Sequence, residues 1–371
     1  MIRGGRWRWC AALFASSLVV LTTPSCASAS DDVATGQWYA SFLNLDAAQQ
    51  LATGDGERVA LIDTGVDYTH PALMGSIDPG ANFAAERDDH GLSDSDGHGT
   101  SLAGLIVGHG RIRGVAPRAR VVSVPNGTVS GLPGPNVTAQ AIEWVIAHGI
   151  KIVCIASSVS PDPIMEQTIR HAMGADVVIV AAVGNESAKA GVVYPASAPG
   201  VLAVGGTDRG GKLSSISATG PDVGIVAPSD HISVARPHNA YAVTTGTSNS
   251  SAIVAGAVAL IRGKYPRLSA QQVISALTST AIDEGQPGRD FDYGFGRIDI
   301  VAALKKAGTM QPQASPQPST SAPTSTSVTV TATSPDPKPG LSTPLLVVII
   351  AAGLLAAAVI VVLVVGLARR R

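Results

Sequence analysis

Short runs of β-branched residues alternate with helical segments through the middle of this chain. Such alternation is typical of a mainly parallel sheet whose strands are connected by crossover helices. We expect strands at residues 59–62, 120–124, 152–155, 177–181 and 201–204. We expect helices at residues 98–107, 139–148, 165–173, 250–264 and 269–279. The run 253–261 is apolar on every face, so its helix is predicted to lie buried at the centre of an α/β fold.

The first residues have the features of an export signal. Basic residues up to Arg8 precede the apolar run 9–21, and Ala27-Ser28-Ala29 offers the small-x-small pattern that signal peptidases cleave. The apolar run is too short to cross about 30 Å of hydrocarbon, so we predict a signal peptide at 1–29 and not a membrane span. A lipoprotein site at Cys26 ranks lower, because the residues before it lack the leucine that such sites prefer.

The other end of the chain has the features of a membrane anchor. Residues 345–368 contain no charge and are followed by three arginines. A helix of this length would measure about 36 Å, which is enough to span a bilayer with some tilt. We predict a transmembrane helix at 344–368 and a cytoplasmic tail at 369–371, because positive residues favour the cytoplasmic side. The chain is therefore expected to be a single-pass protein of the cell membrane, with its globular part extracellular.

The region between these ends divides into two parts. Residues 308–343 are dominated by Pro, Ser and Thr and cannot bury enough apolar surface to fold, so we predict a disordered stalk. Residues 30–307 are expected to form one globular domain. The net charge of −1 argues against nucleic acid as a partner. Cys154 should be the lone cysteine of the mature chain, buried in a strand and without a disulfide.

Three short segments carry the residue types that hydrolytic chemistry requires. Asp63 follows the first predicted strand, His98 stands between two glycines at a helix start, and Ser248 follows Gly-Thr where the buried helix begins. Each segment alone also fits a turn or a helix cap. Together they give the chain order Asp, His, Ser at element ends on one edge of the sheet, which is one of the known orders of a serine-protease triad.

These segments resemble the three signature blocks of the subtilisin-like serine proteases. The resemblance continues in order through Gly114-Val115-Ala116-Pro117, Val183-Gly184-Asn185, Tyr194-Pro195-Ala196 and Val226-Ala227-Pro228. It implies a three-layer subtilisin-like fold and a serine endopeptidase that needs no cofactor. It also implies that Ser248 is the nucleophile, His98 the general base and Asp63 the residue that orients the histidine. Asn185 matches the side-chain donor of the family's oxyanion hole.

Other residues near these positions fit structural roles better. A helix would turn Ser250 and Ser251 away from the position of Ser248. Asp67 lies past the strand end and is expected to be structural. By the same resemblance, His70 occupies a family position outside the catalytic set.

The acidic segment from Asp88 to Asp96 raises the question of a calcium ion. Calcium needs six to eight oxygen ligands, and this segment lacks the fixed spacing of a known calcium loop. We expect a solvated acidic loop and no metal, with calcium kept as the less favoured alternative.

The predicted substrate-binding edge departs from the family pattern. Where the family commonly has Asn-x-Ser-Leu-Gly-Gly after two aliphatic residues, this chain has Cys154-Ile155-Ala156-Ser157-Ser158-Val159. Main-chain pairing with an extended peptide could be retained through Ala156, Ser157 and Ser158. The missing glycine would reshape the pocket for the residue before the cleaved bond, so the side-chain specificity is left open.

Within the family, the chain resembles the mycosins, the membrane-bound subtilases of type VII secretion systems. Ala252 stands where many family members have proline, and only about thirty residues separate the predicted signal cleavage site from the strand of Asp63. That stretch is too short for a folded inhibitory pro-domain. The mycosins share the short extension, the proline-rich stalk and the single C-terminal helix, although the extra cysteines expected in mycosin loops are missing here.

This resemblance implies an endopeptidase that cleaves exported proteins at the outer face of the cell and acts with a type VII secretion membrane complex. The alternative is a scaffold subunit of such a complex, in which turnover is incidental. The intact triad favours the enzyme, while the irregular substrate edge keeps the scaffold open. A broad digestive protease is disfavoured, because a tethered enzyme cannot diffuse to bulk substrate.

Overall fold

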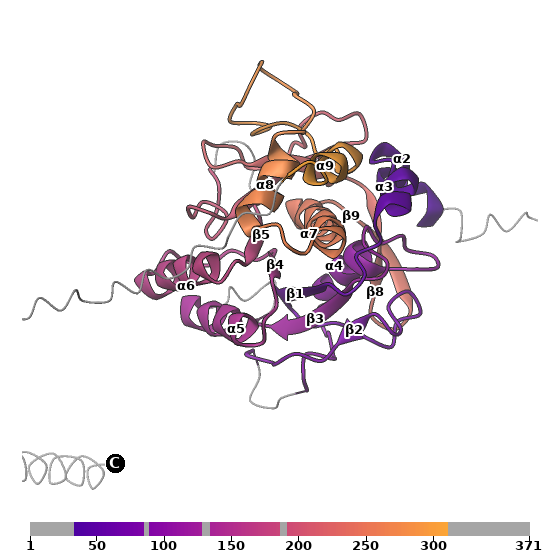
Figure 1. Ribbon diagram of the computed structural model, residues 1–371. Helices are drawn as coiled ribbons and strands as arrows, with labels where there is room; N and C mark the ends of the chain where they lie inside the picture. The colour runs from indigo at the N-terminus through magenta and orange to yellow at the C-terminus, as the bar shows by residue number, and fades with distance from the viewer. Residues whose placement is uncertain (1–32, 85–88, 128–133, 186–190, 311–371) are drawn as a thin grey trace, which may run out of the picture. The chain divides into compact units, whose positions relative to one another are not determined.

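A seven-stranded parallel sheet forms the centre of this computed structural model, which describes residues 33–84, 89–127, 134–185 and 191–310 (Figure 1). The strands are β1 (Arg58–Asp63), β2 (Ile77–Asp78), β3 (Arg120–Pro125), β4 (Ile152–Ile155), β5 (Val178–Ala182), β6 (Leu202–Thr207) and β7 (Ile225–Pro228). Their order across the sheet is β2-β3-β1-β4-β5-β6-β7. A separate antiparallel hairpin consists of β8 (Ile232–Arg236) and β9 (Ala240–Thr244).

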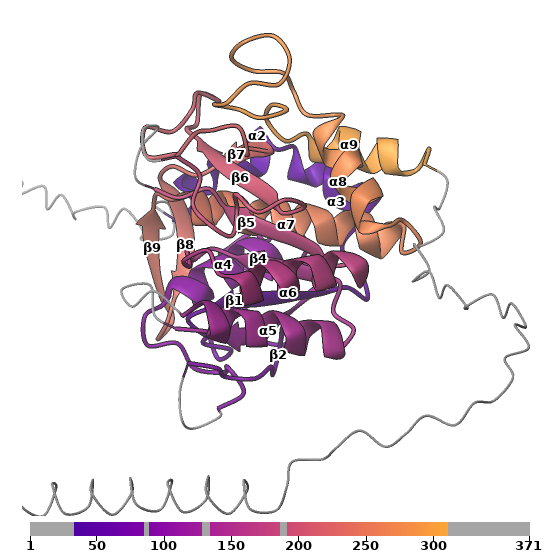
Figure 2. The same ribbon diagram turned by 90° about the vertical axis from the view of Figure 1, so that its left-hand side faces the viewer.

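Helices cover both faces of the sheet, because both sets of alternating strand residues are apolar. In β1, Val59 and Leu61 belong to one hydrophobic cluster, whereas Ala60 and Ile62 belong to the other. The first cluster includes residues of α4 (His98–Val107) and α7 (Thr247–Lys264), and the second those of α5 (Pro135–Ala147) and α6 (Pro163–Gly174). Figures 1 and 2 show the sheet between these two helix layers. The predicted α/β fold with three layers is confirmed.

The helix α7 is the central element of its layer. Its residues from Thr247 to Arg262 are buried, which confirms the prediction for the apolar run 253–261. Gly256 allows the close approach of a neighbouring loop, since a Cβ at this position would lie 2.7 Å from Val115 Cβ. The helices α8 (Ala270–Thr278) and α9 (Ile300–Ala307) pack against α7.

All the strands and helices predicted between residues 59 and 279 are present. Those at 152–155 and 98–107 have the predicted bounds, and the ends of the others are shifted. The largest shift at a helix start is that of α5, which begins at Pro135 instead of residue 139, with the proline in the first turn where its missing N–H costs nothing. Seven further elements were not predicted from the sequence: β2, β7, β8, β9, α9 and the N-terminal helices α2 (Trp38–Phe42) and α3 (Leu45–Leu51). Their apolar stretches are short, so tertiary contacts decide their conformation.

The predicted cysteine environment is also confirmed. Cys154 lies in β4, is fully buried and has a free thiol. Burial raises the pKa of this thiol to about 12, so it is neutral at physiological pH and unsuited to nucleophilic attack.

Some predicted segments fall outside the described residues. These are the signal peptide at 1–29, the transmembrane helix at 344–368, the tail at 369–371 and all but the first three residues of the stalk at 308–343. Within the parts of the chain that are described, no helix is both long and apolar enough to cross a membrane.

Candidate active site

Three polar residues lie at element ends on the carboxyl edge of the sheet. Asp63 is the last residue of β1, His98 is the first residue of α4 and Ser248 is the second residue of α7. The helix α4, between β2 and β3 in the chain, covers one face of the sheet, whereas α5, between β3 and β4, covers the other (Figure 2). Open α/β sheets form their ligand sites at the carboxyl ends of the strands, where successive connections pass to opposite faces of the sheet.

Asp63 and His98 form a direct pair. His98 Nδ1 lies 2.7 Å from Asp63 Oδ1, and the Asp63 side chain is 1% exposed compared with 22% for His98. Thr64 N donates a second hydrogen bond to the same oxygen, at 2.9 Å. Because the carboxylate can only accept, Nδ1 carries the proton and Nε2 of the neutral ring is left as a proton acceptor.

The pKa of His98 is raised above its ordinary value. Burial of the ring alone would lower the pKa, because burial disfavours the charged form. The charge and hydrogen bond of Asp63 outweigh this effect, with further contributions from the charges of Asp96 and Asp94. The imidazolium that a general base becomes is therefore stabilised at this position.

Ser248 differs from the other serines in the first turn of α7. Ser250 Oγ donates to Ala227 O at 2.9 Å, and Ser251 Oγ donates to Ser248 O at 2.9 Å. Ser250 and Ser251 are fully buried, whereas Ser248 is 8% exposed. Among the described residues, no hydrogen bond joins Ser248 Oγ to His98. Catalytic hydrogen bonds are often long in uncomplexed enzymes, so this geometry does not exclude the pair.

Asn185 lies beside the start of α7. Its Oδ1 accepts hydrogen bonds from Thr247 N at 2.8 Å and from Thr247 Oγ1 at 2.9 Å. A Cβ on Gly246 would lie 3.0 Å from Ser248 Oγ and 3.4 Å from Asn185 Nδ2. Ser248 Oγ and the Asn185 amide nitrogen therefore border one small space, and the N-terminus of α7 beside it carries a partial positive charge.

The predicted substrate edge follows directly after β4. Ala156, Ser157 and Ser158 are half-buried and lie outside the sheet, which ends at Ile155 in this strand. Within the described residues, none of their backbone N–H groups donates a hydrogen bond. Ser157 Oγ is buried and has no partner there either. Unpaired main-chain donors at this position suit the pairing that an extended peptide requires.

Asp67 and His70 have structural partners. Asp67 Oδ2 accepts from His238 N at 2.9 Å, and its Oδ1 accepts from Thr69. His70 is fully buried, accepts from Ala72 N with Nδ1 and lies 3.1 Å from Ala240 O with Nε2. Both residues thereby attach the loop after β1 to the β8–β9 hairpin.

The acidic segment is less solvated than predicted. Asp89 accepts from Asn82 Nδ2 and Gly91 N, both at 2.9 Å. Asp94 is only 7% exposed, so the expectation of a solvated loop is wrong for this residue. Asp88 lies outside the described residues, and among those that are described no group of three or more His, Cys, Asp or Glu could hold a metal ion.

Asp94 is the residue near the site that sequence reasoning missed. Its carboxylate accepts from Gly97 N at 2.7 Å and from Thr100 N at 2.9 Å, at the start of α4. The available signal was an Asp placed four residues before the first residue of a predicted helix, a spacing close to that of capping residues.

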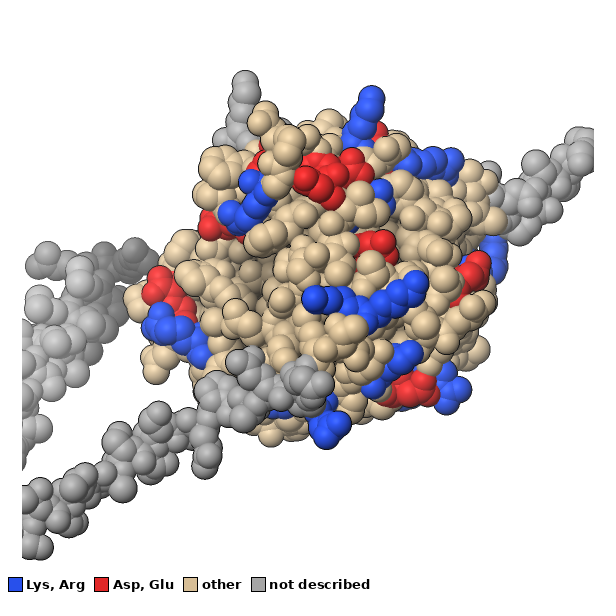
Figure 3. All heavy atoms as spheres, turned by 45° about the horizontal axis from the view of Figure 1, so that its top comes forward, with Lys and Arg blue, Asp and Glu red and all other residues tan. Residues whose placement is uncertain are grey.

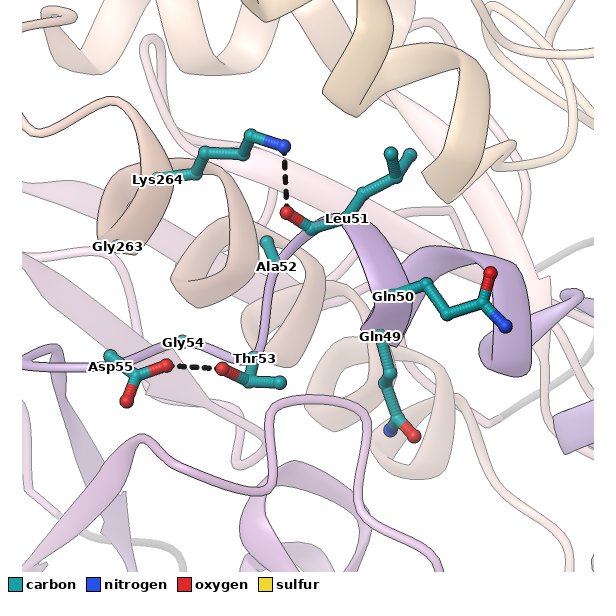
Figure 4. Close-up of a pocket in the computed structure, with 9 residues that line it drawn as sticks. All are labelled: Gln49, Gln50, Leu51, Ala52, Thr53, Gly54, Asp55, Gly263 and Lys264. Atoms are coloured by element: carbon teal, nitrogen blue, oxygen red, sulfur yellow. Dashed lines mark hydrogen bonds between the residues drawn. The ribbon is translucent and has the colours of Figure 1, made fainter.

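A pocket of about 290 Å³ lies at the far end of α7 (Figure 4). Its lining includes Lys264, whose Nζ donates to Leu51 O at 2.7 Å, and Gly263. Lys264 lies sixteen positions after Ser248 in the helix, a distance of about 24 Å. The pocket is therefore the junction between α7 and the N-terminal helix α3, and it is distinct from the edge that carries the triad residues.

The chain has extensive similarity to known proteins. Residues 54–296 match the subtilase family. The chain is 34% identical over 273 residues to subtilisin Savinase of Lederbergia lenta, across 72% of this chain and 98% of the relative. It is 33% identical over 259 residues to subtilisin DY of Bacillus licheniformis, across 68% of this chain and 92% of the relative.

Solved structures of mycosins are similar to it as well. MycP1 from Mycobacterium smegmatis has a TM-score of 0.62 and 28% identity, with 72% of this chain and 84% of that chain covered. MycP3 from the type VII (ESX-3) secretion system has a TM-score of 0.61 and 31% identity, with 72% and 88% covered.

Proposed function

Because the chain belongs to the subtilase family of serine endopeptidases, we propose that it hydrolyses peptide bonds of exported proteins with Asp63, His98 and Ser248. The observation that carries the assignment is the 2.7 Å contact between His98 Nδ1 and the buried Asp63 carboxylate, at the edge where Ser248 begins α7. This contact leaves His98 Nε2 as a base for the serine, whose hydroxyl is a weak nucleophile on its own.

The reaction follows from these positions. Ser248 Oγ attacks the carbonyl carbon of the scissile bond while its proton passes to His98 Nε2. His98 then gives this proton to the leaving amine, the C–N bond breaks and an acyl-enzyme remains on Ser248. Water, deprotonated by His98, hydrolyses the ester and restores the serine.

The oxyanion of each tetrahedral intermediate would lie in the space beside Gly246. Asn185 Nδ2 is free to donate there because Asn185 Oδ1 is engaged by Thr247. In this account, the substrate backbone pairs with Ala156, Ser157 and Ser158, whose N–H groups have no partner within the described residues.

The second part of the proposal concerns the place of action. The predicted signal peptide at 1–29, the predicted Pro/Ser/Thr-rich stalk and the uncharged run 345–368 support an extracellular protease anchored in the cell membrane by one C-terminal helix. Similarity to MycP1 and MycP3 supports a link to a type VII secretion membrane complex.

Protein substrates are the expected partners. The net charge is −1, and on the face seen in Figure 3 the Lys and Arg side chains are interspersed with Asp and Glu among uncharged residues. This distribution does not favour a nucleic-acid backbone, which binds to concentrated positive charge.

Proteomics of the culture medium tests the proposal. A strain that carries Ser248→Ala in place of the parent should accumulate exported proteins with an uncleaved segment, and the parent should release that segment. Identical termini of all exported proteins in the two strains would contradict it.

A scaffold role is the second candidate, and the irregular edge from Ala156 to Val159 favours it. Complementation separates the two functions. If Ser248→Ala fully restores secretion in a deletion strain, the main role is assembly. If the strain secretes proteins that retain the uncleaved segment, the main role is cleavage.

A further inference from the structure

Three backbone segments meet around the Asp63–His98 pair. A Cβ on Gly99 in α4 would lie 2.1 Å from Gly65 O, and a Cβ on Gly65 would lie 1.9 Å from Ser93 O. The end of β1, the loop before α4 and the first turn of α4 are therefore in direct contact. Small errors in this packing would change the distance between His98 and Asp63.

One carboxylate is hydrogen-bonded to all three segments. Asp94 Oδ1 accepts from Thr64 Oγ1 at 2.9 Å, next to Asp63 in β1. The same oxygen accepts from Gly97 N at 2.7 Å, next to His98. Asp94 Oδ2 accepts from Thr100 N at 2.9 Å and from Thr100 Oγ1 at 2.6 Å in the first turn of α4.

The two threonines extend this connection. Thr64 Oγ1 also accepts from Gly99 N at 2.9 Å, so its hydroxyl joins β1 to α4. Thr100 Oγ1 accepts from Asp67 N at 2.9 Å and joins α4 to the loop after β1. Every group around the Asp94 carboxylate is a donor, as an ionised carboxylate requires.

We propose that Asp94 is a positioning residue of the proposed triad, which holds the end of β1 and the start of α4 in the register that brings His98 to Asp63. This inference rests on the proposed function of the triad. Asp94 does not touch the substrate or the reacting atoms. It acts through Thr64 and Gly97, the immediate neighbours of Asp63 and His98.

Asp94 also contributes charge to the site. The charged groups that face His98 are Asp63, Asp94 and Asp96, and their charges raise the pKa of the imidazole. Arg236 approaches from the β8–β9 hairpin, where its Nη2 donates to Asp96 O at 2.7 Å. Removal of the Asp94 charge is therefore expected to lower the pKa of His98.

The test measures the labelling rate of the full-length, membrane-bound protein with a fluorophosphonate probe as a function of pH. Asp94→Asn keeps the size of the side chain, but it removes the charge and presents an NH₂ group to donors. We expect the labelling rate per folded molecule to fall about tenfold or more, because misplaced reacting groups are costly. We expect the midpoint of its acid limb to move to lower pH.

Three variants complete the design. Asp89→Asn removes a carboxylate of the same segment that is hydrogen-bonded to Asn82 and Gly91, and it should leave both the rate and the midpoint at the parent values. Thr64→Val removes the hydroxyl between Asp94 and Gly99 and should lower the rate, whereas Thr64→Ser should restore it. The comparison of Thr64→Val with Thr64→Ser keeps the inference testable if Asp94→Asn does not fold.

A merely structural role predicts another result. In that case Asp94→Asn would lower the unfolding temperature, and the folded fraction would keep the parent rate and midpoint. That outcome, or equal rates for Thr64→Val and Thr64→Ser, would overturn the inference. A parent protein that reacts no faster than its Ser248→Ala variant would instead overturn the proposed function itself.

Discussion

Asn185 turns its amide oxygen to Thr247, the first residue of α7. This oxygen accepts hydrogen bonds from the backbone N of Thr247 at 2.8 Å and from its Oγ1 at 2.9 Å. This contact fixes which end of the amide faces Thr247. The nitrogen is then available on the side of Ser248, where the carbonyl oxygen of a bound peptide would acquire negative charge. A rigid donor of this kind needs no reorganisation during the reaction, which is why such donors are effective.

Replacement of Asn185 should therefore lower kcat much more than it raises KM. Loss of one such donor costs about 2.7–4 kcal/mol in subtilisin, a member of the same family, and we expect Asn185→Ala to fall in that range. Thr247→Val removes the hydroxyl anchor and keeps the backbone anchor, so its loss should be smaller. Steady-state kinetics on a chromogenic peptide measures both variants. An unchanged kcat in Asn185→Ala would place the oxyanion donor elsewhere.

Gly246 should tolerate no side chain in an active enzyme. Its φ of 174° is extended backbone that any residue can adopt, so Gly246→Ala should cost little stability. The added Cβ would lie 3.0 Å from Ser248 Oγ and 3.4 Å from Asn185 Nδ2, in the space that the substrate carbonyl needs. We expect at least about a tenfold loss of kcat/KM, since misplaced reacting groups carry penalties of this order. The matched control is Gly174→Ala at the end of α6, where an added Cβ would meet nothing within 4 Å. Activity that is equal in both variants would contradict the assignment of this space.

The pH dependence of activity should reflect the environment of His98. The base must be neutral to accept the serine proton, so the rate should rise with pH as His98 loses its proton. Because the pKa of His98 is raised, the midpoint of this rise should lie above the ordinary histidine value of 6.5. Asp63→Asn removes the largest contribution that raises the pKa and should move the midpoint to lower pH while it lowers the rate. A midpoint that does not move would show that the limb belongs to another group.

His70 should make folding stability depend on pH in the acid range. Burial lowers its pKa in the folded state below the ordinary value of 6.5, and this outweighs the hydrogen bond to Ala240 and the charge of Asp67, which raise the pKa. The unfolded state then binds more protons, so the free energy of unfolding should decrease as the pH falls below about 6.5. In urea titrations, His70→Asn should show a weaker pH dependence than the parent. A slope in His70→Asn equal to that of the parent would contradict this assignment.

Much of the fold was predictable because its signals are local. The strands β1, β3 and β4 are continuous apolar runs, and the helix α7 is apolar on every face, so both could be read from short windows of sequence. Asp63 ends such a strand, and His98 and Ser248 lie in the first turns of α4 and α7. Their common position at one edge is a consequence of parallel strands with crossover helices.

The remaining features depend on contacts between distant segments. Among the described residues, the hairpin β8–β9 forms a two-stranded sheet of its own and contains exposed residues, so it lacks the fully buried pattern of the central strands. The spacing of Asp94 to α4 is a local signal, but its role also depends on a donor from Thr64, 30 residues away in the sequence. The orientation of Asn185 likewise depends on Thr247, 62 residues away.

The central claim is that Ser248 is the nucleophile activated by His98, and covalent labelling tests it most directly. The full-length protein is treated with a fluorophosphonate probe at pH 8, digested and analysed by mass spectrometry, beside Ser248→Ala and Ser250→Ala. We predict one adduct on Ser248, its absence in Ser248→Ala and its retention in Ser250→Ala. An adduct that persists in Ser248→Ala, or no adduct on the parent protein, would contradict the account.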